Sequence, residues 1–188
     1  ITGSFTELTA QGLAEQLSYG ALPISFEYRQ LRLEGWLGRV YQRDDQALLS
    51  ITALPNGIIS GRTLKWHRLT GIWVTHLAAC AVGHRLHSAV VATDVTLMLD
   101  PLDQAEASEQ LGNLLISRQA GMNAPLPVAI KTAFAWLAGK DPDKALAEAA
   151  KAYDGDDRRK GERSENAADA LIHPVDLGCV YLHASQQP

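Results

Sequence analysis

The stretches Ile24-Ser-Phe-Glu-Tyr28 and Leu31-Arg-Leu-Glu-Gly-Trp-Leu-Gly-Arg-Val40 decide the fold. Apolar side chains alternate with polar or small residues in both, and this period of two is typical of β-strands with one buried face. Asp44-Asp45-Gln46 has the composition of a turn, and the apolar stretch 47–51 follows it. The sequence therefore predicts an antiparallel hairpin in this region.

The next part of the chain predicts the rest of a sheet and a helix packed on it. A third strand is expected over 57–65, after the turn residues Pro55-Asn56-Gly57. Over 68–82 the apolar residues recur at helical steps, and Gly83 is placed to end the helix. The β-branched stretch 89–100 predicts the strand that closes a mixed sheet.

The second half of the chain is predicted to be mainly helical. Helices are expected over 104–122, 128–138 and 141–153, the last begun by Asp141 at the N-cap and Pro142 in the first turn. A short amphipathic helix over 7–17 precedes the strands. The order of these elements predicts an α+β fold.

The domain organisation follows from composition. With 188 residues and 46% hydrophobic residues, one core is expected. We predict one α+β domain over 1–153 that includes the C-terminal helices. The segment 154–165 contains no apolar side chain and is predicted to be a charged, mobile loop. A short helical tail is expected over 166–188.

Charge and cysteine content limit the class of protein. Seventeen basic against 21 acidic residues give a net charge of -4, so DNA contact must be local rather than global. Cys80 and Cys179 are far apart in the sequence, which favours a reduced, cytoplasmic protein. No apolar run approaches the roughly 18 residues of a membrane span, and the chain begins with Ile1, which suggests a fragment.

Basic residues gather in one region and are interleaved with aromatic ones. Phosphate contact and base stacking use such side chains, and the candidates for DNA binding are Arg39, Arg43, Arg62, Lys65 and Arg68. Trp36 and Trp66 lie among them and are candidates for binding a partner protein, since Trp and Arg are enriched at interface hot spots. Both alternatives remain open.

Residues that could hold a metal ion do not form a convincing set. A magnesium-dependent nuclease needs at least two carboxylates, whereas the strands supply only Glu34, with Asp44 and Asp45 in a turn. His84 and His87, with His76 nearby, lack a third zinc ligand at a recognised spacing. We therefore expect no metal and no cofactor.

Several motifs together resemble one family. Leu33-Glu-Gly-Trp-Leu-Gly38, Gly57-Ile-Ile-Ser-Gly-Arg-Thr-Leu-Lys65 and Trp73-Val-Thr-His-Leu-Ala-Ala-Cys80 resemble the C-terminal domain of the gamma (RecC) subunit of exodeoxyribonuclease V. Further stretches, from Pro101-Leu102 to Gly161-Glu162, agree in order and spacing. The resemblance spans about residues 20 to 165.

The resemblance implies a restriction-endonuclease-like (PD-(D/E)XK-type) mixed sheet with packed helices and a degenerate active site. Active relatives of that fold have Gly-x-x-Asp on the second strand, Asp-x-Lys on the next and Gln-x-x-x-Tyr on the following helix. The degenerate positions here are expected to be Gly38, Ser60, Arg62, His76 and Cys80. A second register would instead place Thr63-Leu-Lys65 on the Asp-x-Lys positions, also without a carboxylate. No catalytic residue and no activity of the isolated domain are expected.

The resemblance also implies partners and a process. It predicts a scaffold and DNA-handling domain that assembles with the beta (RecB) and alpha (RecD) subunits, with roles in duplex splitting and Chi recognition during double-strand break repair. The alternatives are a metal-dependent nuclease with a residual active site, and a pure protein-binding module.

Overall fold

The computed structural model describes residues 18–19, 21–42, 47–61, 63–124, 129–156 and 159–165. The chain divides into two compact units, residues 1–119 and 120–188. The helix predicted over 7–17, the turn at 44–46 and the tail at 166–188 lie outside the described residues.

The opening strands of the first unit form a regular hairpin. Strands β2 (Leu22–Tyr28) and β3 (Leu31–Leu37) pair antiparallel from Leu22↔Leu37 to Tyr28↔Leu31. Leu22, Ile24 and Phe26 of β2 are buried in the core and Tyr28 is partly buried, as the alternation predicted. The other face is charged, and Arg32 forms ion pairs there with Glu27 at 3.6 Å and Glu34 at 2.6 Å.

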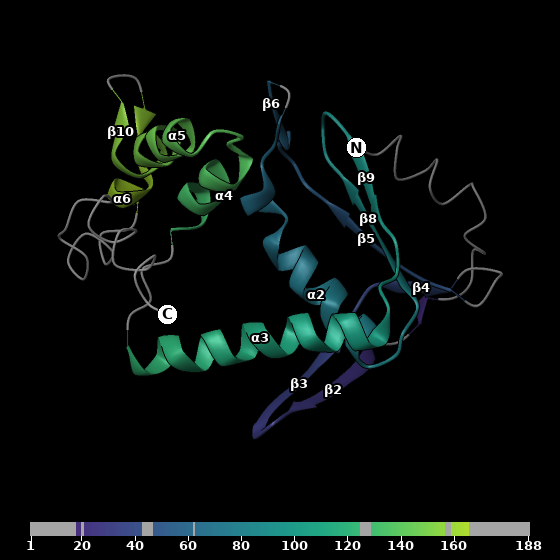
Figure 1. Ribbon diagram of the computed structural model, residues 1–188. Helices are drawn as coiled ribbons and strands as arrows, with labels where there is room; N and C mark the ends of the chain where they lie inside the picture. The colour runs from purple at the N-terminus through teal and green to yellow at the C-terminus, as the bar shows by residue number, and fades with distance from the viewer. Residues whose placement is uncertain are drawn as a thin grey trace. The chain divides into compact units, whose positions relative to one another are not determined.

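A five-stranded mixed sheet lies beside this hairpin (Figure 1). Its strands run in the order β1-β4-β5-β8-β9. Strands β4 and β5 are antiparallel, β5 and β8 are parallel, and β8 and β9 are antiparallel. Their bounds are β1 (Ser18–Tyr19), β4 (Val40–Gln42), β5 (Leu48–Ala53), β8 (Leu86–Val91) and β9 (Thr96–Leu99). The α+β class and the mixed sheet are thereby confirmed.

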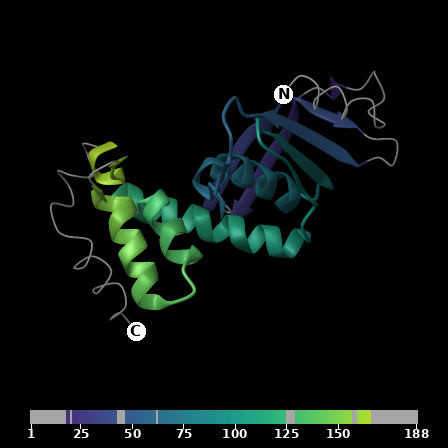
Figure 2. The same ribbon diagram turned by 90° about the horizontal axis from the view of Figure 1, so that it is seen from above.

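Helix α2 (Thr70–Ala81) forms the crossover between the parallel strands and covers one sheet face (Figure 2). It follows a 3₁₀ turn, η1 (Trp66–Arg68). Its second half, from His76 to Ala81, is buried against Leu48 and Leu86. Gly83 follows the helix with φ 89°, a left-handed conformation that favours glycine, as predicted.

Helix α3 (Gln104–Asn123) begins in the first unit and closes its core. Ala107 and Leu111 are buried with the residues of α2 and the hairpin. A Cβ atom at Gly112 would lie 2.5 Å from the ring of Tyr28. Only glycine lets the hairpin tip approach the helix this closely.

The segment 57–65 differs from the prediction of a third sheet strand. It forms two short strands, β6 (Ile59–Ser60) and β7 (Thr63–Leu64), which pair with each other. The Asp94 carboxylate accepts hydrogen bonds from the backbone N–H groups of Ile58 at 2.9 Å and Ile59 at 2.8 Å. Gly61 turns the chain with φ 61°. The hydrogen bonds to the Asp94 carboxylate, at least 35 residues further along the chain, take the place of a sheet ladder.

The stretch predicted as one strand over 89–100 contains two. Strands β8 and β9 are joined by a turn around Asp94, where Ala92 N–H donates to Val95 at 2.9 Å. Asp94 lies in this turn and also accepts the two backbone hydrogen bonds from the 57–59 segment. The alternating pattern of apolar residues is interrupted at this polar turn.

The second unit is a helical pair followed by a small hairpin. It contains α4 (Ile130–Ala138), α5 (Pro142–Asp154), β10 (Gly155–Asp156), β11 (Arg159–Lys160) and α6 (Glu162–Glu165). Asp141 caps α5 by accepting from the N–H groups of Asp143 at 3.1 Å and Lys144 at 3.3 Å, as predicted. The described part of 154–165 therefore has secondary structure where the sequence predicts a loop.

Candidate functional site

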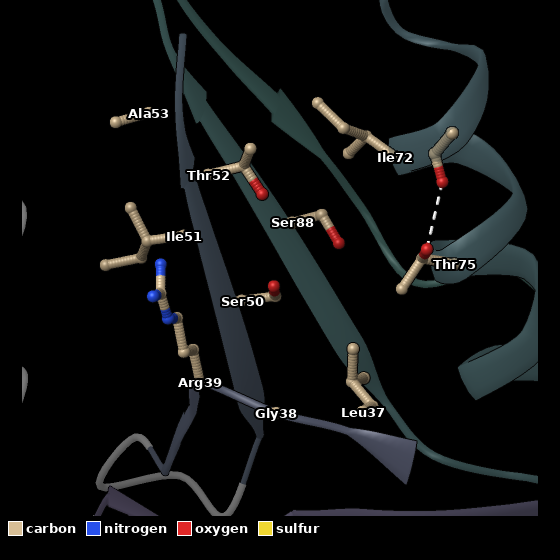
Figure 3. A pocket seen from close by; sticks show the side chains of 11 residues that line it. Leu37, Gly38, Arg39, Ser50, Ile51, Thr52, Ala53, Ile72, Thr75 and Ser88 are labelled. Atoms are coloured by element: carbon tan, nitrogen blue, oxygen red, sulfur yellow. Dashed lines mark hydrogen bonds between the residues drawn. The ribbon is translucent and has the colours of Figure 1, made fainter. Parts of the chain in front are cut away.

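A pocket of about 340 Å³ lies between β5 and the first half of α2 (Figure 3). Among the described residues it is lined by polar, small and apolar side chains and by no carboxylate. The lining residues are Leu37, Gly38, Arg39, Ser50, Ile51, Thr52, Ala53, Gly71, Ile72, Thr75 and Ser88.

Small side chains on the two facing elements leave this space open. On β5 the residues that face α2 begin with the buried Leu48 and continue with Ser50 and Thr52. The facing positions on α2 are Gly71 and Thr75, one turn apart. A Cβ atom at Gly71 would meet no atom within 4 Å, so the helix leaves the strand uncovered here.

Four hydroxyl groups point into or border the pocket (Figure 3). Thr75 donates to the Gly71 carbonyl oxygen at 2.9 Å, so its proton stays within the helix. Ser88 lies 2.9 Å from Nδ1 of His76. Ser50 and Thr52 form no side-chain hydrogen bond with any residue that the structure describes. Half-buried hydroxyls of this kind can bind a ligand or water.

His76 lies in the core behind the pocket and contacts the lining residue Ser88. Its Nε2 lies 3.0 Å from the Asp100 carbonyl oxygen, so Nε2 carries the proton and Nδ1 accepts from Ser88. Burial lowers the pKa of His76, the bond to Asp100 raises it and the charge of His87 lowers it, with burial the largest effect. The shift favours the neutral form of His76, whose ring stacks on Trp73 with ring centroids 5.7 Å apart.

Arg39 is the one charged residue among the described residues that line the pocket. It has φ 57°, a left-handed conformation that is uncommon outside glycine. Its exposed side chain lies along the edge of β5 beside Ile51 (Figure 3). No carboxylate among the described residues forms an ion pair with it.

The other predicted DNA-binding residues lie elsewhere or outside the described part. Lys65 and Arg68 each donate to the Gly57 carbonyl oxygen at 3.4 Å. The bonds from Ile59 and Ile58, and the charge of Lys65, lower the pKa of Asp94 in the same turn. Arg43 and Arg62 are outside the described residues. Of the three that the structure describes, Arg39 alone lines the pocket.

The predicted partner-binding tryptophans are exposed, Trp36 by 74% and Trp66 by 44%. Trp36 lies opposite Pro23 on the charged face of the hairpin. Large apolar side chains with this exposure are available for contact with another protein.

The predicted degenerate positions are not gathered in one place. Gly38 lines the pocket, and Ser60 is exposed at the end of β6. Cys80 is buried 3.8 Å from His76 in the core. Arg62 is outside the described residues.

The alternative metal-site residues are also separate from the pocket. Glu34 is paired with Arg32 on the hairpin, and His87 lies 3.3 Å from the Asp100 carboxylate. Within the described ranges, no three His, Cys, Asp or Glu side chains gather closely enough to hold a metal ion.

The pocket residues Ser50, Thr52, Thr75 and Ser88 were missed by the sequence reasoning. Ser50 and Thr52 interrupt an apolar strand at alternate positions, which is the signal that could have found them. Their partner Thr75 could not have been found this way, because only the crossover of α2 brings it opposite β5.

The fold and the pocket define a class of protein. It is an α+β domain with a pocket beside its crossover helix, and no described lining residue of that pocket is acidic. The family model of the RecC C-terminal domain matches residues 3–141. The chain therefore belongs to the RecC C-terminal domain family, and this membership implies a place in the RecBCD complex. No curated protein matches the chain. None of the described helices combines the length and apolarity needed to cross a membrane.

Proposed function

We propose that this chain is a non-catalytic scaffold and DNA-handling domain of the gamma subunit of exodeoxyribonuclease V. It would act in the cytoplasm in double-strand break repair by homologous recombination. The observation that carries the proposal is the lining of the pocket, which offers hydroxyl groups and no carboxylate among the described residues. Metal-dependent hydrolysis of DNA needs carboxylates to hold Mg²⁺, so we expect none from this domain.

A degenerate restriction-endonuclease-like fold would account for where the pocket lies. Strand β4 follows Gly38 in the chain, and the next strand in the sheet, β5, carries Ser50 and Thr52 at the Asp-x-Lys spacing. The helix that follows has Gly71 and Thr75 at the Gln-x-x-x-Tyr spacing. All five line the pocket. This coincidence supports β5 and α2 as the degenerate motif elements, in place of the 57–65 segment.

Assembly is the second part of the proposed function. The domain would dock against the beta (RecB) and alpha (RecD) subunits, and it would assist duplex splitting and Chi recognition in the holoenzyme. The exposure of Trp36 and Trp66 supports a protein-binding role for these side chains. Arg39, Lys65 and Arg68, all at least partly exposed, would contact phosphates.

Two alternatives differ in their expected behaviour. A residual nuclease would depend on Glu34, which is ion-paired with Arg32 on the hairpin and belongs to no group of three His, Cys, Asp or Glu side chains among the described residues. A pure protein-binding module would have no affinity for DNA. A single assay of DNA binding and DNA integrity separates all three.

The test is a fluorescence-anisotropy titration of single-stranded and forked DNA with the chain, in Mg²⁺, followed by length analysis of the recovered DNA. We expect intact DNA and salt-sensitive binding. Arg68→Gln should weaken binding, whereas Lys140→Gln, which removes an exposed charge in the second unit, should leave it unchanged. Shortening of the DNA that disappears in Glu34→Ala would establish the nuclease alternative instead.

A further inference from the structure

Lys65 and Arg68 bring two positive charges to one atom, the carbonyl oxygen of Gly57. Lys65 Nζ and Arg68 Nη1 each lie 3.4 Å from that oxygen, so the two nitrogens are separated by at most twice this distance. Both hydrogen bonds are longer than the roughly 2.7 to 3.2 Å that is usual for an N–H donor and an oxygen. Each uses one of the several N–H donors of its group, so both groups keep donors for another acceptor.

The backbone of the same segment holds the two side chains in this arrangement. Lys65 N–H donates to the Ile58 carbonyl oxygen at 2.7 Å, which places Lys65 beside Gly57. Arg68 N–H donates to the Lys65 carbonyl oxygen at 2.9 Å, and residues three apart in a 3₁₀ turn lie on one face. The two charges are therefore held together by main-chain bonds, next to the β6–β7 hairpin and at the N-terminal end of α2 (Figure 1).

No carboxylate of the described residues neutralises this pair by direct contact. Neither Lys65 nor Arg68 forms an ion pair within the part of the chain that the structure describes. The Asp94 carboxylate lies in the adjoining turn, where hydrogen bonds from the N–H groups of Ile59 and Ile58 lower its pKa. Asp94 therefore stays charged, and the three side chains together carry one positive charge. This charge matches the single negative charge of a phosphate within a DNA strand.

We infer that Lys65 and Arg68 together bind one phosphate group of a DNA strand, as a two-cation clamp. Arg68 is exposed and Lys65 is partly exposed, so the site is open to solvent. The guanidinium group gives directed, charge-assisted hydrogen bonds to phosphate oxygens, and the ammonium group adds a compact charge. The inference rests on the proposed function, because it assigns both residues to the same phosphate in the DNA that this domain would hold.

The test measures binding of short oligothymidylate to the 188-residue chain in EDTA over a range of salt concentrations. For a single strand, each phosphate contact that is lost reduces the slope of log K against log salt by about 0.7. We expect the double variant Lys65→Gln and Arg68→Gln to lose about this amount, because both charges serve one phosphate. Contacts with two separate phosphates would give a loss of about 1.4, and that result would overturn the shared site.

The single variants Lys65→Gln and Arg68→Gln test the sharing directly. Substitutions at independent sites reduce the binding constant by factors that multiply, whereas residues with a common partner depart from this rule. We expect the double variant to lose less affinity than the product of the two single losses, since the first substitution already opens the clamp. Lys65→Arg keeps the charge and should keep the wild-type salt slope. Losses that multiply would contradict the clamp.

Arg85→Gln and Lys140→Gln are the matched controls, because each removes an exposed charge elsewhere in the chain, and both should keep the wild-type slope. An unchanged double variant, with oligothymidylate bound by the wild type, would overturn the clamp and leave DNA handling intact. Absence of any oligothymidylate binding by the wild type would overturn the DNA-handling proposal itself. Weaker assembly of the double variant with the beta and alpha subunits, at unchanged DNA affinity, would assign the two charges to an acidic protein surface instead.

Discussion

His76 is a buried polar side chain whose protonation opposes folding. Its pKa lies below the ordinary 6.5, chiefly because of burial. Below about pH 6.5 the unfolded chain therefore binds a proton that the folded chain takes up only at lower pH, and the free energy of unfolding decreases. The loss approaches about 1.4 kcal/mol per pH unit for one proton. His76→Gln should remove this part of the pH dependence, because an amide does not titrate.

Urea unfolding followed by tryptophan fluorescence, repeated from neutral to mildly acidic pH, measures the effect. His84→Gln is the matched control, since His84 has no side-chain partner among the described residues, and it should follow the wild-type pH profile. Parallel profiles for the wild type and His76→Gln would show that His76 is not the group responsible.

The N-terminus of helix α4 is capped by a side chain about 30 residues further along the chain. Its N-cap residue, Ala129, has no side chain that could accept a hydrogen bond. The Glu162 carboxylate of α6 fills this role, accepting from Lys131 N–H at 3.1 Å and from the N–H and hydroxyl of Thr132 at 3.0 Å each. A carboxylate at this end also complements the helix dipole. Glu162→Ala should therefore cost about 2 kcal/mol of unfolding free energy.

Hydrogen exchange at the amides of residues 131 and 132, together with chemical unfolding, measures that cost. Glu162→Gln keeps an acceptor oxygen but loses the charge, and its loss should be smaller. Glu148→Ala, at an exposed position of α5, should change the stability little. Equal stability of Glu162→Ala and Glu148→Ala would contradict the capping role.

At the scale of elements, sequence patterns predicted the strands, helices and caps that interactions between neighbouring residues determine. The alternation in β2 and β3, the periodicity of α2 and the cap at Asp141 were all read from neighbouring residues. The structure of the 57–65 and 154–165 segments could not be read in this way. It depends on Asp94 and Glu162, which accept hydrogen bonds from backbone groups about 30 or more residues away. A run without apolar residues gives no sign that one of its carboxylates caps a remote helix.

For the first unit as a whole, the sequence predicted the α+β class and the mixed sheet, but not the pocket. Gly38 was singled out from its motif. Ser50 and Thr75 could be recognised as pocket residues only in the folded chain, where the parallel crossover places α2 over β5. Strand order and register are properties of the folded chain. They decide which small side chains face one another, and single-sequence patterns do not contain them.

If this architecture is that of a nuclease with its acids removed, restoring two of them should restore a metal site. A Cβ atom at Gly38 would meet nothing within 4 Å, so an aspartate has room there, and Ser50 lines the same pocket. The double variant Gly38→Asp and Ser50→Glu should bind one Mn²⁺, seen as loss of the free-ion signal in electron paramagnetic resonance. Gly35→Asp with Ser50→Glu adds the same charge but leaves one carboxylate in the pocket, since Gly35 is not among its lining residues. Equal Mn²⁺ binding by both double variants would show that net charge attracts the ion. No binding by the first would break the correspondence between Gly38, Ser50 and the metal-holding positions of active relatives.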